Sequence, residues 1–238
     1  MISLRDTLKL NNQAAALFHS ENFPQAEIAY NESLCFFKII LEESHYQDVG
    51  MASTASLPQH ECLHSMSAHK SRCKISSHHG GSFVYQSPLI LNELPSSSLH
   101  PTSRSTSVQA MIIYCAAVVF NTAILHHQES IKTGSSVCLD RAAELYEASI
   151  RLVGKFPTTV ASSNKTISLI AMAASNNLAQ IEFQKGLLDQ ACKRLQVLKH
   201  LMTQSLRHVV PYIFTIDEFE GMLSNTLSAK GVIASPAA

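Results

Sequence analysis

The chain has 238 residues, of which 46% are apolar and only 15% are charged, with 18 basic side chains balancing 18 acidic ones. This length is enough for one large domain or two small ones, each with a real hydrophobic core. The formal net charge of zero gives no long-range field to attract nucleic acid or an anionic membrane, so the composition argues against both as partners.

The amino terminus and the cysteines indicate an intracellular protein. The first 13 residues, MISLRDTLKLNNQ, contain no apolar stretch like that of a secretory signal. The six scattered cysteines are therefore expected to be reduced thiols, and we predict a cytoplasmic or nuclear protein. The longest apolar run, residues 110–125, is shorter than the roughly 20 residues that cross a bilayer, and Asn121 interrupts it. We expect a buried central helix there.

The first predicted unit, residues 1–44, is a helical hairpin. Residues 8–20 predict one helix, and the break at Glu21 and Asn22 leads into a second helix with Pro24 in its first turn. A core-facing stripe at positions i, i+4, i+7 and i+8 marks that second helix: Ala26, Tyr30, Ser33 and Leu34.

Residues 45–107 have a different composition, rich in Ser and His and poor in charge. Such a stretch buries too little apolar surface to offset the entropy of ordering, which predicts a long, largely disordered insertion. Within it, FVYQSPLIL at residues 83–91 has aromatic and β-branched side chains around Pro88. This predicts a short edge strand or an extended segment docked on the helices.

The remaining helices are expected within residues 108–230. A long apolar helix at 108–128 comes first, and Gly186 is a natural stop for a later one. Past an irregular connection with Pro211, Asp217 is expected to open a final helix over roughly residues 218–229, which caps the stack. Residues 231–238 are expected to form a flexible tail.

An internal repeat organises these helices. AEIAYNESL at 26–34 recurs as AAELYEASI at 142–150, and an Asn-x-Ala tripeptide precedes each block and occurs a third time at Asn177. Asn12 precedes Ala26 by 14 residues and Asn177 precedes Ala191 by 14, whereas a seven-residue excess within the turn-rich SIKTGSSVCLD lengthens the middle copy. The predicted repeat-packing positions are Asn12, Ala14, Ala26, Tyr30, Asn121, Ala123, Ala142, Tyr146, Asn177, Ala179, Ala191 and Leu195.

The pattern Asn-x-Ala, Gly or an equivalent, then Ala-x3-aromatic-x2-small is similar to the tetratricopeptide repeat (TPR) of about 34 residues. The third copy, NNLAQIEFQKGLLDQA, matches best, while Glu21 replaces the usual Gly in the first copy and His126 an aromatic residue in the second. The closing proline is missing from all three, so the copies are TPR-like. This resemblance implies an all-α protein: an α-solenoid of about three stacked antiparallel hairpins whose inner groove binds peptides or helices.

The chain also resembles a family of algal TPR-like proteins, a resemblance that implies no known activity. It covers most of the chain outside the Ser/His-rich stretch. The segments that carry it are FVYQSPLIL, VVFNTAILHH, AELYEASI, AASNNLAQIEF and EFEGMLSN.

Side chains that could carry chemistry are few. A group of cysteines and histidines in the insertion lacks any CxxC pair, which favours a low-complexity tract over a zinc site. His126 and His127 are adjacent on a helix and point about 100° apart, so they cannot share a metal. No phosphate-binding loop, nucleophile elbow or HExxH motif is present, and we predict no catalytic, cofactor-binding or metal residues. The insertion group is Cys62, His64, His69, Cys73, His78 and His79.

These observations predict a non-catalytic scaffold that binds a protein or peptide on the concave face, with no cofactor and with self-association through an uncovered end of the stack. The polar, exposed candidates for that face are Gln13, His19, His127, Gln180 and Gln184. One alternative is regulatory: phosphorylation (Ser76 follows Arg72 and Lys74) or a metal switches the insertion, and residues 83–91 occupy the groove until released. An enzyme of unrecognised type is the other alternative.

Overall fold

The structure is a computed structural model that describes residues 3–48, 68–70, 77–79, 82–92, 104–156, 164–205 and 214–233. Over these residues the chain is mostly helical, which confirms the expected all-α class. The helices are α1 (Leu4–His19), α2 (Phe23–Asp48), α3 (Arg104–Thr133), α4 (Ser136–Val153), α6 (Lys165–Gln184), α7 (Leu188–Ser205) and α9 (Ile216–Ile233). The strands are β1 (Ala68–Lys70), β2 (Ser77–His79), β3 (Ser82–Val84) and β4 (Leu89–Leu91).

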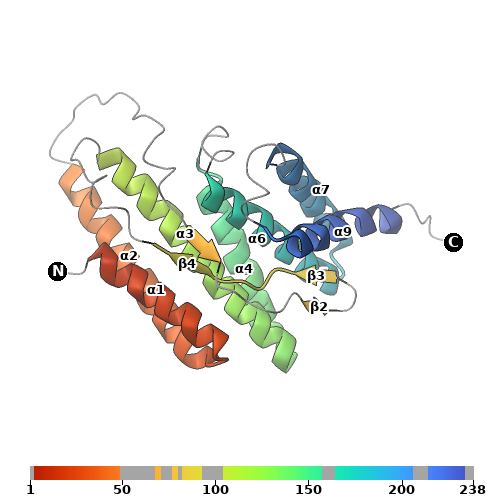
Figure 1. Cartoon of the computed structure of the whole chain (residues 1–238), viewed down its shortest axis with the longest axis horizontal. Helices are drawn as coiled ribbons and strands as arrows, with labels where there is room; N and C mark the ends of the chain where they lie inside the picture. The colour runs from red at the N-terminus through yellow and green to blue at the C-terminus, as the bar shows by residue number, and fades with distance from the viewer. Residues whose placement is uncertain are drawn as a thin grey trace.

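Consecutive helices pack as antiparallel pairs. α1 packs on α2, α3 on α4, and α6 on α7, and neighbouring pairs meet where α2 contacts α3 and α4 contacts α6. α9 follows the third pair and packs on α7 (Figure 1). The strands contact the first helix of each pair and the last helix of the chain: α1, α3, α6 and α9.

Local signals explain where several helices begin. Ser3 and Asp6 form a reciprocal capping box at α1, and the Asn164 side chain accepts hydrogen bonds from two backbone N–H groups of α6. α9 begins two residues before the predicted 218, because Thr215 and Glu218 cap each other's backbone N–H groups: the Glu218 N–H donates to Thr215 at 3.2 Å and the Thr215 N–H to Glu218 at 2.8 Å. It runs to Ile233, so residues 231–233 of the predicted flexible tail are helical.

The turns inside the first and third pairs have a residue with left-handed backbone conformation at the same position of the repeat. Gly186 has φ +73°, and Glu21, nine positions after Asn12 as Gly186 is after Asn177, has φ 61°. A side chain with a Cβ costs roughly 1–2 kcal/mol in this conformation, whereas glycine adopts it freely. The first copy therefore keeps the turn but carries strain at Glu21.

The seven-residue excess of the middle copy is helical, not an enlarged loop. α2 begins 11 positions after Asn12 and α7 begins 11 after Asn177, but α4 begins 15 after Asn121. α4 also starts six positions before Ala142, whereas α2 starts three before Ala26. About one turn is thus added to each helix, and only Gly134 and Ser135 lie between them.

The apolar helix α3 lies in the centre of the molecule. Residues Val108–Thr133 have a mean hydropathy of 2.0 in their most apolar window, so by length and composition this helix could cross a membrane. However, 78% of that window is buried inside the protein, as expected for the core helix of a folded domain. The helix is longer at both ends than the predicted 108–128.

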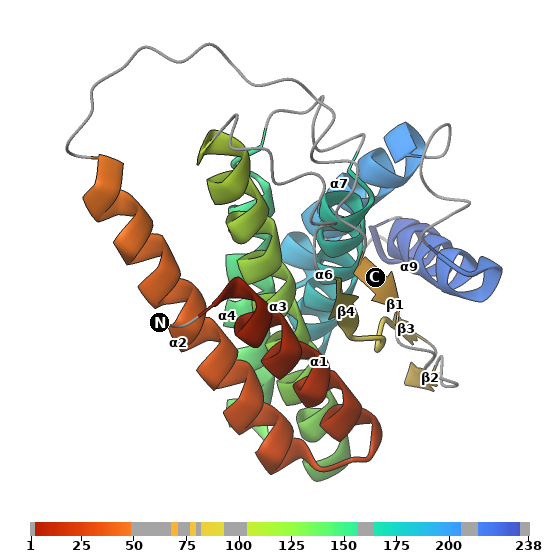
Figure 2. The same cartoon turned by 60° about the vertical axis from the view of Figure 1, so that its left-hand side comes forward.

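The extended segment over residues 82–92 contains β3 and β4. β4 pairs antiparallel with β1, and β3 pairs antiparallel with β2. Figure 2 shows these short strands lying between α1 on one side and α9 on the other. Helix α2 reaches Asp48 and α3 begins at Arg104, so both ends of the predicted insertion are helical.

Candidate functional site

The segment from Phe83 to Leu91 is buried although it lies in an otherwise polar stretch of sequence. Phe83 is 1% exposed, Leu89 is fully buried and Leu91 is 2% exposed. An extended chain at such depth must find hydrogen-bond partners for its backbone N–H and C=O groups. One edge of the segment has the short strands β1 and β2 as partners.

The other edge is held by asparagine side chains. Each of four asparagines accepts a hydrogen bond from the N–H of one residue through Oδ1 and donates to the C=O of that same residue through Nδ2. The eight bonds are 2.7 to 3.1 Å long. The pairs are Asn12 with Leu91, Asn121 with Leu89, Asn177 with Tyr85, and Asn225 with Phe83.

The four asparagines lie on α1, α3, α6 and α9, one on each helix that contacts the strands. The segment runs opposite to the order of these helices, because the first helix holds Leu91 and the last holds Phe83. The residues held are alternate ones at each end, as expected for an extended chain whose successive backbone groups point to opposite edges. The stretch from Gln86 to Pro88 connects Tyr85, held by α6, with Leu89, held by α3.

Two further asparagines make the array repetitive. Asn11 donates to the C=O of Leu89 at 3.1 Å, and its Oδ1 accepts from Asn121 at 2.9 Å. Asn176 donates to the C=O of Phe83 at 3.0 Å, and its Oδ1 accepts from Asn225 at 2.7 Å. The same unit of three asparagines therefore occurs twice, once between α1 and α3 and once between α6 and α9.

An asparagine amide is well suited to this role because it presents one donor and one acceptor side by side, as a neighbouring strand would. Each satisfied buried bond contributes about 0.5–1.5 kcal/mol, and a buried group that loses its partner costs about 1–3 kcal/mol. The bonds involve only backbone atoms of the segment. The asparagines therefore hold this extended segment through its main chain and not through its side chains.

Side-chain contacts add a second layer of recognition. A Cβ built at Gly221 on α9 would lie 2.3 Å from the Phe83 ring, so only glycine leaves room for that ring. The ring of Tyr85 lies 6.0 Å from that of Phe120 and 6.1 Å, edge-on, from that of Phe214. The α6–α9 end of the array thus packs around two aromatic side chains of the segment.

Tyr146 forms a hydrogen bond with one asparagine of the array. Its hydroxyl accepts a hydrogen bond from Nδ2 of Asn177 at 2.9 Å and lies 3.4 Å from Nδ1 of His127. Burial raises the pKa of Tyr146, which keeps the hydroxyl protonated, although the bond from Asn177 opposes that shift. This tyrosine belongs to the repeat pattern, so one repeat position both packs the second hairpin and bonds to an asparagine of the array.

The predicted repeat positions divide into two groups. The nine that are not asparagine are buried among the helices: Ala14, Ala26, Tyr30, Ala123, Ala142, Tyr146, Ala179, Ala191 and Leu195. The three asparagines hold the segment. The sequence pattern missed Asn225 because Thr226 and Leu227 follow it, so it lacks the Asn-x-Ala signature.

The predicted partner-binding residues lie in different environments. Gln13 and Gln184 are exposed and His19 is half-buried. The expectation that all five are exposed is wrong for His127, which is 1% exposed, and for Gln180, which is 5% exposed. His127 lies on α3 and Gln180 on α6, and both helices are covered by neighbouring helices and by the segment.

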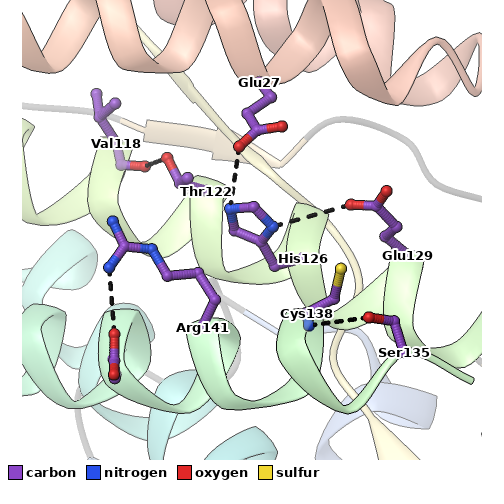
Figure 3. Close-up of polar contacts among 9 residues, drawn as sticks. Glu27, Val118, Thr122, His126, Glu129, Ser135, Cys138 and Arg141 are labelled. Atoms are coloured by element: carbon purple, nitrogen blue, oxygen red, sulfur yellow. Dashed lines mark hydrogen bonds and ion pairs between the residues drawn. The ribbon is translucent and has the colours of Figure 1, made fainter.

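A separate polar group lies where α2, α3 and α4 meet (Figure 3). His126 on α3 faces Glu27 on α2, with its Nε2 3.6 Å from Glu27 Oε1, and its Nδ1 is 3.9 Å from Glu129 Oε2. The Cys138 side chain on α4 points toward the same space. Burial lowers the pKa of His126; Glu27 and Glu129 oppose this shift and Arg141 adds to it.

The Cys and His residues of the insertion are not brought together by any described contact. Cys62, His64 and Cys73 lie outside the described residues, as does Ser76. For His69, His78 and His79 only the backbone in β1 and β2 is described.

Comparison with known proteins finds no relative. No family model matches the chain, and neither a curated protein nor a solved structure matches it.

Proposed function

We propose that this protein is a non-catalytic, TPR-like interaction scaffold whose groove binds an extended peptide, and that residues 83–91 hold this groove in the resting state. In this proposal the stacked pairs form a short solenoid of about three repeats, with α9 as its cap. Their first helices, together with α9, line the groove with the asparagines that hold the segment.

The asparagine array carries the proposal. Eight hydrogen bonds from four side chains are directed only at backbone atoms of the segment. Recognition of a peptide by main-chain bonds together with pockets for alternate side chains is a general mode of peptide binding. A partner that fits has aromatic residues two positions apart, followed after Pro88 or its equivalent by two leucine-like residues.

The segment is joined to the helices by the same chain, so it competes with any partner at a high effective concentration. A partner therefore gains access only when the segment detaches. The balanced charge of the chain supports a protein ligand over nucleic acid, and the expected setting is the cytoplasm or nucleus.

The test uses a labelled peptide with the sequence of residues 82–92 and measures its binding to the full chain by fluorescence anisotropy. Phe83→Ala weakens the internal segment, so the variant should bind the free peptide at least tenfold more tightly than the wild type, since 1.4 kcal/mol is a factor of ten. Adding Gly221→Ala should abolish this gain, because the new methyl group excludes the phenylalanine of the peptide.

Two controls make the test specific. A shuffled peptide of the same composition should not bind, and a peptide methylated on the nitrogen corresponding to Leu89 should bind weakly because it cannot donate to Asn121. Circular dichroism must show that each variant keeps its helices. If a folded Phe83→Ala variant binds no peptide, the segment is a fixed part of the core and the scaffold proposal fails.

Hydrogen exchange on the wild type tests the same point without a mutation. We expect the amides of Phe83, Tyr85, Leu89 and Leu91 to exchange through local opening, with a lower free energy than the amides of α3. Exchange only by global unfolding would contradict a releasable segment. The regulatory alternative predicts the same local exchange. It differs in the trigger that releases the segment, such as phosphorylation of the insertion.

A further inference from the structure

Among the described residues, one group of three side chains has the donors and the spacing of a metal site. The ligand atoms of His126, Glu129 and Cys138 all lie within 4.8 Å of one another. Figure 3 shows them converging from the end of α3 and the start of α4. This group, called the α3–α4 corner below, lies apart from the asparagine array, and none of its three residues holds the segment.

The histidine is already oriented as metal-binding histidines are. His126 is only 8% exposed, and its Nδ1 has no hydrogen-bond partner. Its other nitrogen, Nε2, faces the carboxylate of Glu27. A metal-bound imidazole usually donates its second N–H to a carboxylate, which fixes the tautomer and leaves the first nitrogen free to bind the metal. A buried ring nitrogen without a partner otherwise destabilises a fold.

The added helical turns supply the other two donors. Glu129 lies eight positions after Asn121 and Cys138 four before Ala142, in the part of the hairpin where the seven extra residues fall. In the third copy the three corresponding positions are Glu182, Lys185 and Leu187, and in the first copy they are Leu17, Ser20 and Asn22. The donor set therefore occurs only in the lengthened copy of the repeat.

We propose that His126, Glu129 and Cys138 bind one zinc ion, with Glu27 as the carboxylate that orients His126. Imidazole, thiolate and carboxylate together suit zinc, whereas magnesium and calcium prefer oxygen ligands alone. Donor atoms around tetrahedral zinc lie roughly 3.3 to 3.8 Å apart. Side-chain rotations that move the three ligand atoms by about 1 Å therefore close the site. Three protein ligands leave the fourth position for water or an incoming group.

The charges around the corner are compatible with a dication. Glu27 and Glu129 contribute two carboxylates, and the nearby Arg141 is bonded to Glu144 at 3.1 Å. Zinc here would link α3 directly to α4, and through Glu27 to α2. It would therefore join the first hairpin to the second.

The experiment is a titration of the reduced, metal-free full chain with Co²⁺, which replaces zinc and absorbs light. We expect one equivalent to bind with a thiolate-to-cobalt charge-transfer band that zinc then removes. Cys138→Ser should abolish that band, and His126→Ala should weaken binding at least tenfold. Glu27→Gln should weaken binding by about 10- to 100-fold while the band is retained, as expected for a positioning residue.

Matched variants separate this site from the other cysteines. Cys35→Ser, on an exposed position of α2, and the double variant Cys62→Ser/Cys73→Ser should keep both the band and the affinity. Zinc should also raise the melting temperature of the wild type and of Cys35→Ser but not that of Cys138→Ser. A wild type without the band, or a band that survives in Cys138→Ser, overturns the proposal.

Discussion

The two ends of the asparagine array share one polar unit but differ in the side chains that pack beside it. At the α1–α3 end, Asn11, Asn12 and Asn121 hold two leucines, Leu89 and Leu91. At the α6–α9 end, an equivalent set of three asparagines holds a phenylalanine and a tyrosine. The hydrogen bonds fix the path of the main chain at both ends, whereas the apolar contacts depend on which side chains the segment carries. The asparagine–backbone bonds are thus the repeated feature of the array, and the side-chain contacts are what differs between its ends.

The largest effect should come from the aromatic pocket. Phe83→Ala should lower the free energy of unfolding by about 3–5 kcal/mol, because it empties a fully enclosed site. Gly221→Ala should cost about 1–3 kcal/mol in the wild type through overpacking and almost nothing in the Phe83→Ala background. Urea denaturation of all four members of this cycle measures the coupling. Additive effects would mean that the ring does not occupy this pocket.

The polar units should respond equally. Asn121→Asp and Asn225→Asp each remove one donor to a buried C=O and one to a neighbouring asparagine, and each place a carboxylate beside the carbonyl. We expect each to lower the free energy of unfolding by about 2–3 kcal/mol.

The control for this pair is Asn31→Asp, on an exposed position of α2, which should change stability by less than about 0.5 kcal/mol. A difference of more than about 1 kcal/mol between the Asn121 and Asn225 variants would show that the two units are not equivalent.

The smallest effect concerns the turns. Glu21→Gly should raise the free energy of unfolding by up to about 1 kcal/mol, because it relieves the left-handed strain and loses only an exposed ion pair with Lys132. Gly186→Ala, at the corresponding turn, should lower it by about 1 kcal/mol. Thermal unfolding of both variants measures the contrast, and shifts of the same sign would contradict it.

Periodicity in the sequence predicted the helices because the apolar spacing is strong, and it singled out Asn12, Asn121 and Asn177. It assigned them to repeat packing because nothing in a helix pattern tells which strand an amide will face. The segment at 83–91 was recognisable as extended, yet its partners lie up to 142 positions away. For a similar reason the sequence pattern relates His126 only to its neighbour His127 and leaves Cys138 among the scattered cysteines. Their meeting depends on added helical turns, and a turn-rich composition had suggested a loop there instead.

The reversed direction of the segment has a consequence during synthesis. Phe83 leaves the ribosome early, but its partner Asn225 is translated 142 residues later. At roughly 5–20 residues per second this interval lasts about 7 to 28 s. Throughout that time the apolar strand of the nascent chain lacks its last partner, and such transiently exposed apolar surface favours aggregation until folding is complete.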